Sequence, residues 1–251
     1  MIKGPLVTVY ITNYNYGKYI EKSINSVINQ TYKNIEIIII DDCSNDNSRK
    51  KFNKFLNIQN IKFIFNSKKI GLVKSANKAI KRSKGAYFIR LDADDMFKKS
   101  AIEKLIEIVK NNKKISMLFP NFHFFFEKTK KTKEFKYMNK NKYSLTDFPA
   151  HGACSMIKKS SFEKIGGYSE LFDRQDGFYI WTAFLTRNYI IKHLNKSLFY
   201  YRIHGKNLSK NFIKILNERN KIISHFLKKN INNTELLLVK KKTEKELISL
   251  K

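Results

Sequence analysis

The chain has 251 residues and a formal net charge of +29, from 50 basic and 21 acidic side chains. This length suits one large α/β domain, or a core domain with a smaller appendage. Such a charge usually indicates nucleic acid or an anionic membrane surface as the partner. Lysine supplies most of it, whereas arginine, which specific nucleic-acid readers use for bidentate contacts, is scarce. We therefore expect no specific nucleic-acid partner and keep an anionic membrane surface as a hypothesis.

The cysteines and the apolar runs indicate the compartment. Cys43 and Cys154 are too few and too unpatterned for a disulfide framework or a zinc site, which favours a reducing compartment. No apolar run reaches the roughly 20 residues that a bilayer-spanning helix needs. No hydrophobic signal segment precedes the first predicted strand. We expect a cytoplasmic protein, with any membrane contact peripheral and at the inner face of the cell membrane.

The first half of the chain alternates predicted strands with predicted helices. Apolar runs predict strands at residues 6–12, 35–40, 61–65, 86–91 and 115–119. One-sided apolar spacing predicts helices at residues 19–29, 73–81 and 101–109, with a further helix after Asn47. Repeated strand and helix units predict a doubly wound, mostly parallel α/β sheet over residues 1–120.

The pattern changes after residue 120. An aromatic run, Phe122–Phe126, precedes the lysine-rich residues 128–142, which predict a solvated loop or hairpin. The next expected elements are a short helix ending at residue 167, a helix over 176–187, short strands over 190–194 and 198–201, and a long basic helix over 208–229. We expect the last residues, to 251, to fray. The predicted division is 1–120 and 121–210 as two halves of one domain, and 211–251 as a basic helical extension.

An acidic run, Asp92, Asp94 and Asp95, directly follows the predicted strand 86–91. Along a strand Asp92 and Asp94 would point the same way, so their charges repel unless a cation or a ligand lies between them. Carboxylate oxygens suit Mg²⁺ or Mn²⁺, which leave coordination positions for substrate phosphates. The alternative is that Asp94 or Asp95 caps the next helix. A helix cap would account for one aspartate but not for all three, so the run predicts a metal site.

Three polar residues stand at or just after the ends of separate predicted strands: Thr12, Asp42 and Asp92. In a doubly wound sheet, ligands gather at the carboxyl ends of the strands. The three residues are far apart in sequence, and this topology would bring them to one crevice. Their convergence predicts a nucleotide site.

Five short motifs stand at these and neighbouring positions: Val9-Tyr10-Ile11-Thr12-Asn13-Tyr14-Asn15, Gln30-Thr31-Tyr32, Ile39-Ile40-Asp41-Asp42-Cys43-Ser44-Asn45-Asp46, Gly71 with Ala76-Asn77, and Leu91-Asp92-Ala93-Asp94-Asp95. Through them the chain resembles a family 2 glycosyltransferase of the GT-A fold over most of residues 5–210. The resemblance implies a Rossmann-like, mostly parallel sheet flanked by helices, with a smaller C-terminal acceptor-side region. It also implies inverting transfer of a sugar from a nucleotide-sugar donor, expected to be UDP-linked, to a glycan or lipid-linked glycan acceptor.

The resemblance implies roles for the matching residues of the first half. Thr12 and Tyr14 would line the pocket of the nucleotide base, and Asp42 would accept a hydrogen bond from that base. Asp92 would lie near the ribose and diphosphate. Asp94, together with Asp95, would hold an Mn²⁺ or Mg²⁺ ion that neutralises the charge on the departing nucleoside diphosphate. Lys74, one turn into its helix, would assist, although a solvated lysine is the favoured interpretation.

In the second half, Asp176 matches the carboxylate base of the family, with Gln175 where glutamate is commoner. The resemblance implies that Asp176 takes the proton from an acceptor hydroxyl as that oxygen attacks the anomeric carbon. The structural alternative is a helix N-cap, which is compatible with catalysis because a cap lies at an exposed helix start.

Three aromatic or imidazole side chains complete the expected site. Tyr200 to Ser209 is similar to a C-terminal signature of the family, in which His204 would join the metal shell, touch the diphosphate or serve a structural role. His151 would shape the acceptor side, and Trp181 would stack on a sugar or pack in the core.

Two other function classes stay open from the sequence. One is a nucleic-acid-binding protein, which the charge alone suggests. The other is a sugar nucleotidyltransferase, which shares the sheet but normally has a glycine-rich phosphate loop after the first strand. Residues 12–18 contain one glycine, so this class is disfavoured.

Overall fold

The computed structural model describes residues 4–205, 207 and 211–250. In this part of the chain, nine strands form one sheet in the order β3-β2-β1-β4-β8-β6-β9-β5, with β7 paired to β6. The strands are β1 (Val7–Asn13), β2 (Ile35–Asp41), β3 (Ile61–Phe65), β4 (Tyr87–Asp92), β5 (Met96–Phe97), β6 (Ile115–Phe126), β7 (Thr132–Phe135), β8 (Met156–Lys158) and β9 (Ile190–Ile203).

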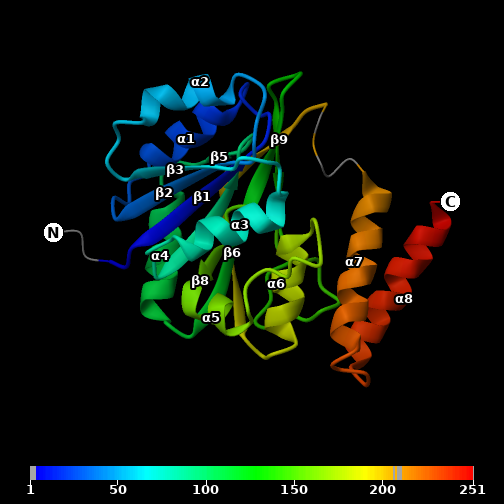
Figure 1. The fold of residues 1–251 in the computed structure, drawn as a ribbon. Coiled ribbons are helices and arrows are strands. Elements are labelled where there is room, and N and C mark those ends of the chain that lie inside the picture. The colour runs from blue at the N-terminus through cyan, green and yellow to red at the C-terminus, as the bar shows by residue number, and fades with distance from the viewer. Residues whose placement is uncertain (1–3, 206, 208–210, 251) are drawn as a thin grey trace.

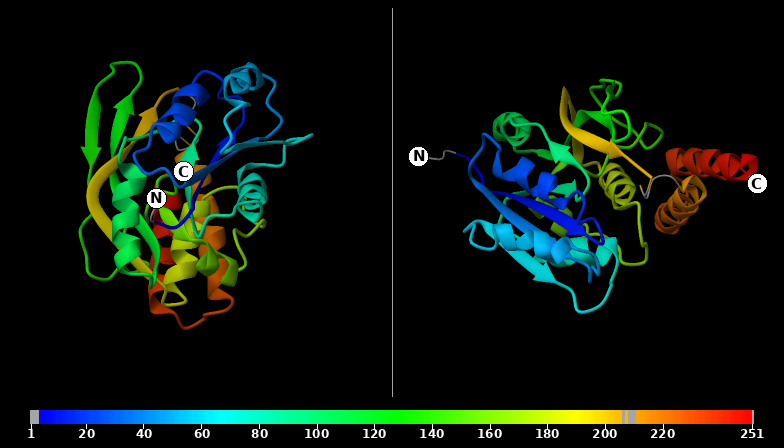
Figure 2. Two further views of the ribbon diagram at one scale, coloured as in Figure 1. Left: turned by 90° about the vertical axis from the view of Figure 1, so that its left-hand side faces the viewer. Right: turned by 90° about the horizontal axis from the view of Figure 1, so that it is seen from above.

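Helices cover both faces of the central strands (Figure 1; Figure 2). They are α1 (Ile20–Ile28), α2 (Ser48–Phe52) continued by a 3₁₀ turn (Asn53–Phe55), α3 (Leu72–Lys81), α4 (Ala101–Asn111), α5 (Lys159–Lys164), α6 (Asp176–Leu185), α7 (Phe212–Leu227) and α8 (Thr234–Ser249). Helix α1 buries Ile20, Ile24 and Val27, the one-sided apolar face that the sequence predicts.

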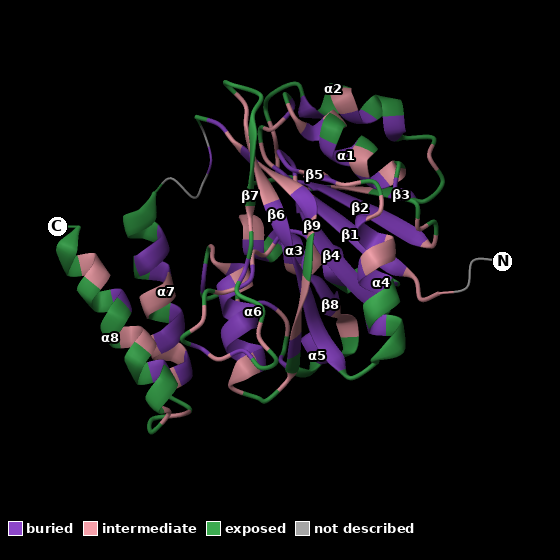
Figure 3. Ribbon diagram, turned by 180° about the vertical axis from the view of Figure 1, so that it is seen from behind, coloured by how far each residue is buried: buried purple, intermediate pink, exposed green. Residues whose placement is uncertain are grey.

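The mostly parallel sheet is confirmed. β3, β2, β1 and β4 run parallel to one another, and β6 is parallel to β9. β8 runs antiparallel between β4 and β6. Every residue of β2 is buried, because strands of a parallel sheet are covered on both faces (Figure 3). This buried centre fixes the positions at which β1, β2 and β4 end.

The second half of the chain continues the same sheet. Strand β6 crosses the expected boundary at residue 120, and β5 from the first half pairs with β9 from the second. The two expected short strands are one long strand, β9, with irregular register against β6. Residues 128–142 contain β7, which forms a hairpin with β6 as predicted.

The C-terminal extension is a pair of helices at one side of the sheet, with α7 packed against α6 (Figure 1). The expectation of a frayed end is wrong up to residue 250, because α8 packs along α7 and buries Leu236 and Thr243. The expected start of the basic helix at residues 208–210 lies outside the described residues. None of the helices described has the length and apolar character to cross a bilayer.

Candidate functional site

A pocket of about 380 Å³ opens at the carboxyl ends of β1 and β4. Its volume lies in the range typical of small-molecule sites. It collects seven of the residues predicted from sequence: Thr12, Tyr14, Asp42, Asp92, Asp94, His151 and Asp176. The sheet explains the gathering, since Thr12 of β1 is the direct neighbour of Asp92 at the end of β4.

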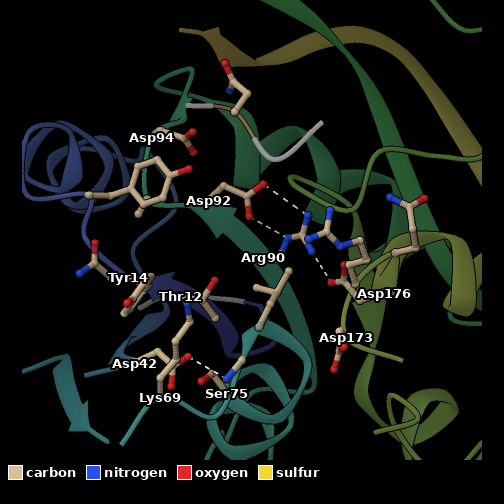
Figure 4. A pocket seen from close by; sticks show the side chains of 18 of the residues that line it. Thr12, Tyr14, Asp42, Lys69, Ser75, Arg90, Asp92, Asp94, Asp173 and Asp176 are labelled. Atoms are coloured by element: carbon tan, nitrogen blue, oxygen red, sulfur yellow. Dashed lines mark hydrogen bonds and ion pairs between the residues drawn. The ribbon is translucent and has the colours of Figure 1, made fainter. Parts of the chain in front are cut away.

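One wall of the pocket consists of Thr12, Tyr14 and Lys69 (Figure 4). The Nζ atom of Lys69 lies 3.8 Å from the centroid of the Tyr14 ring, a cation–π contact. Lys69 was not among the residues predicted from sequence. Lys74, which was, is exposed and does not line the pocket. The basic side chain at this wall is therefore Lys69.

Asp42 organises the loop that forms the adjoining wall. Its Oδ1 accepts hydrogen bonds from the Asn66 side chain and the Ile70 backbone, both at 2.9 Å, and its Oδ2 accepts one from the Gly71 backbone at 2.8 Å. Gly71 has a φ of 90°, a conformation that favours glycine. A carboxylate has about four acceptor sites, so these three bonds leave about one for a ligand.

Asp94 and His204 form a pair in the pocket region. Nε2 of His204 lies 2.9 Å from Oδ2 of Asp94, and both residues are buried. Burial and the nearby charge of Asp92 raise the pKa of Asp94 above its ordinary value. Burial, followed by the charges of Asp94 and Asp92, raises the pKa of Tyr16. The pocket therefore has an excess of negative charge on this side, which a cation would relieve.

This donor set fits a hard divalent ion. Within the described ranges, no three His, Cys, Asp or Glu side chains gather as a preformed metal site. Mg²⁺ and Mn²⁺ bound with a nucleotide commonly take only one or two protein carboxylates and complete their shells with phosphate and water. Asp94 with its histidine neighbour meets that requirement.

The structure places Asp95, the second expected metal ligand, outside the lining of the pocket. Its side chain is fully buried and does not line the pocket. Its Oδ1 accepts a hydrogen bond of 2.9 Å from the Arg202 backbone. Burial and the charges of Asp94 and Asp92 raise its pKa well above the ordinary value. Asp95 thus ties the acidic loop to β9.

Asp176 is the first residue of α6, and its carboxylate points toward the acidic end of β4 (Figure 4). It is 5% exposed and lines the pocket. Oδ2 of Asp176 accepts a hydrogen bond from Nη1 of Arg90. The preceding residue, Gln175, has a φ of 63° and accepts a hydrogen bond of 2.9 Å from Arg219 of α7. The helix start is thereby fixed from two sides.

Arg90 was missed by the sequence reasoning. Its guanidinium lies between Asp92 and Asp176, with Nε 2.9 Å from Oδ1 of Asp92 (Figure 4). The strand pattern carried a signal, because alternation places Arg90 on the same face as Asp92, two residues later. A cation within an apolar, buried strand needs a partner, and the sequence did not reveal that Asp176 is the second one.

His151 lines the pocket as expected, and its Nδ1 accepts a hydrogen bond of 3.1 Å from the Ala153 backbone. Burial lowers the pKa of His151 to about 4, so its ring is neutral near pH 7. Trp181 is fully buried, is absent from the pocket lining and meets Phe119 and Tyr143 edge-on. Its expected sugar contact is therefore wrong, and core packing, the alternative, is what the structure shows.

Comparison with known proteins identifies relatives across most of the chain. The model of a family described as Glycosyl transferase family 2 matches residues 8–166. An uncharacterized glycosyltransferase of Rickettsia typhi is 30% identical over 250 residues, which cover 96% of this chain and 77% of that protein. An uncharacterized glycosyltransferase of Haemophilus influenzae is 40% identical over 115 residues, which cover 45% of this chain and 36% of that protein.

Two solved structures share the fold. S. aureus TarS 1-349 in complex with UDP-GlcNAc aligns with a TM-score of 0.72 and 16% identity, covering 87% of this chain and 66% of that one. The mannosyltransferase PcManGT from Pyrobaculum calidifontis, in complex with GDP-Man and Mn²⁺, aligns with a TM-score of 0.71 and 13% identity, covering 90% and 65%. The chain thus spans about a third of the Haemophilus relative and just under two thirds of each solved chain.

Proposed function

The chain belongs to glycosyltransferase family 2, and we propose that it transfers a sugar, with inversion, from a UDP-linked donor to a hydroxyl group of a glycan or lipid-linked glycan. The observation that carries the proposal is that Asp42, Asp92, Asp94 and Asp176 line one and the same pocket. It offers nucleotide contacts, a place for a cation and a separate carboxylate base. TarS with UDP-GlcNAc and PcManGT with GDP-Man, which share the fold, support a nucleotide-sugar donor.

On the donor side, Thr12 and Tyr14 would line the base pocket, and Asp42 would use its remaining acceptor site for the base. Asp92 would lie beside the ribose and diphosphate. Asp94, with His204, would hold Mn²⁺ or Mg²⁺, as the Mn²⁺ in the PcManGT structure supports. The bound ion would supply positive charge at the departing diphosphate.

On the acceptor side, Asp176 would be the general base, with His151 nearby at the pocket wall. The acceptor oxygen forms a bond to the anomeric carbon while the bond from that carbon to the diphosphate oxygen breaks. The hydroxyl proton passes to the Asp176 carboxylate. Attack opposite the leaving group inverts the anomeric centre.

The experiment begins with a screen of UDP-, GDP- and other nucleotide sugars, with Mn²⁺, for a rise in melting temperature. Donors that stabilise the protein are then assayed for release of the nucleoside diphosphate. We expect Asp94→Ala and Asp176→Asn to abolish release while the protein stays folded. Asp173→Asn is the matched comparison, because Asp173 is exposed at the same pocket, three residues before Asp176. Loss of activity in Asp173→Asn alone would overturn the base assignment.

The C-terminal helices support a peripheral membrane contact. Helix α8 exposes Leu237 and Leu238 at 47% and 59% and carries Lys240, Lys241 and Lys242. Apolar side chains interspersed with lysines suit an anionic lipid surface. Vesicles containing anionic lipid should co-sediment the protein at about 0.15 M salt, where the Debye length is about 8 Å. Equal sedimentation with neutral vesicles, or none with either, would refute this contact.

A further inference from the structure

We propose that Arg90 is a positioning residue for the transfer reaction, which holds the Asp176 carboxylate in place relative to Asp92 and the donor. The inference rests on the proposed function, because that proposal makes Asp176 the base. It adds a residue that touches neither sugar in the scheme and acts through the base.

The contacts of Arg90 link the two sides of the pocket. Nε lies 2.9 Å from Oδ1 of Asp92 and Nη2 lies 3.3 Å from Oδ2, while Nη1 donates to Oδ2 of Asp176 (Figure 4). Asp92 ends β4 and Asp176 begins α6, so residues 84 positions apart in sequence share one guanidinium. The planar guanidinium can meet two carboxylates with separate edges, which a lysine ammonium cannot reproduce.

The surroundings hold Arg90 in this place. The backbone oxygen of Arg90 accepts a hydrogen bond of 2.9 Å from Cys154. A Cβ atom on Gly152 would come within 2.8 Å of Nη2 of Arg90. A Cβ atom on Gly177, in the first turn of α6, would come within 3.0 Å of Cα of Gly152. The two glycines allow the loop, the helix start and the guanidinium to pack closely.

Three buried titratable side chains that interact with Asp176, those of Tyr10, Tyr168 and His151, contribute no positive charge near pH 7. Burial raises the pKa of the Tyr10 and Tyr168 hydroxyls, which lie 3.2 Å apart, and lowers the pKa of His151 to about 4. All three are therefore neutral near pH 7. Asp92 is an additional negative group. Without Arg90, the Asp176 carboxylate would face the Asp92 carboxylate with no direct counter-charge from this set.

The decisive comparison uses Arg90→Met and Arg90→Lys in the full chain, with Arg49→Met as the matched control. Arg49 also pairs with a buried aspartate, with its Nε 3.2 Å from Oδ2 of Asp41, but it does not line the pocket. The readouts are the affinity for UDP with Mn²⁺ and kcat with the best donor from the screen. Thermal unfolding checks that each variant folds.

For Arg90→Met we expect kcat to fall about 100-fold, the scale of a misplaced catalytic group, with UDP affinity changed less than about threefold. Arg90→Lys should recover part of kcat, and Arg49→Met should match the wild type. If Arg90→Met does not fold, Arg90→Lys decides: a fall of about tenfold or more in kcat at unchanged UDP affinity supports the role.

Wild-type kcat in a folded Arg90 variant would overturn the inference, provided that Asp176→Asn is inactive. Equal losses of UDP affinity and kcat would also overturn it, because they would place Arg90 in donor binding. If the wild type neither binds UDP nor uses any donor, the proposed function fails instead. The two failures are therefore distinguishable.

Discussion

Replacing Asp42 with alanine should both loosen the loop of residues 66–71 and remove nucleotide binding. Asp42 is 5% exposed and accepts three hydrogen bonds, from Asn66, Ile70 and Gly71. Hydrogen bonds to charged groups contribute about 1.5–3 kcal/mol each, but the two backbone donors can turn to water once the loop moves. We therefore expect a net loss of about 3 kcal/mol in the free energy of unfolding. For a chain of this size, that is a fall of roughly 6–12 °C in melting temperature.

Differential scanning calorimetry, with and without UDP and Mn²⁺, measures both effects of the Asp42 variant. Asp42→Asn is the graded comparison, because its amide oxygen can still accept from Asn66 and Ile70 while its NH₂ group opposes the Gly71 N–H. Its loss should be smaller than that of alanine. Asp173→Ala, exposed at the same pocket, should shift the melting temperature by less than about 2 °C. An Asp42→Ala protein that melts within about 2 °C of the wild type would refute this account of the loop.

Three further predictions concern buried groups. The raised pKa values of Asp94 and Asp95 mean that folding favours their protonated forms. Their contribution to the free energy of unfolding is full below the ordinary aspartate pKa of about 4 and is lost as the pH rises through the raised pKa values. Urea unfolding measured between pH 4 and 8 will show this loss. Asp95→Asn keeps an acceptor for the Arg202 backbone. It should flatten the decline of stability with pH and leave the Mn²⁺ dependence of activity intact. Loss of the Mn²⁺ dependence would identify Asp95 as a metal ligand. Trp181→Ala should lower the free energy of unfolding by about 3–5 kcal/mol. Trp181→Phe should keep the wild-type KM for the acceptor. A large rise in that KM would contradict a purely structural role for Trp181.

The sequence was sufficient to predict the parallel strands of the first half and the gathering of Thr12, Asp42 and Asp92 at one pocket. Thr12, Asp42 and Asp92 each follow a buried apolar run, and parallel strands of known order bring such positions to one edge. The predicted strand over residues 86–91 ends one residue before β4 does, at Asp92. These predictions depend on local pattern and on topology alone.

Other features depend on long-range packing, which local pattern does not contain. Asp95 follows Asp94 directly, yet Asp95 is fully buried and bonded to β9 whereas Asp94 lines the pocket. Helix α6 is buried on almost all sides, so its sequence could not show whether Trp181 faces the pocket or the core. The pairing of Arg90 with Asp176 joins β4 to α6, and α8 is stabilised by α7 despite its many lysines.

The central claim is inverting transfer with Asp176 as the base, and the anomeric configuration of the first product tests it most directly. The best donor from the screen is incubated with protein and Mn²⁺, with acceptor or with water as the acceptor, and ¹H NMR follows the anomeric proton from the earliest time points. The account predicts a first product of configuration opposite to that of the donor, formed by the wild type and not by Asp176→Asn. A first product with the donor's configuration, or undiminished formation by Asp176→Asn, would contradict it.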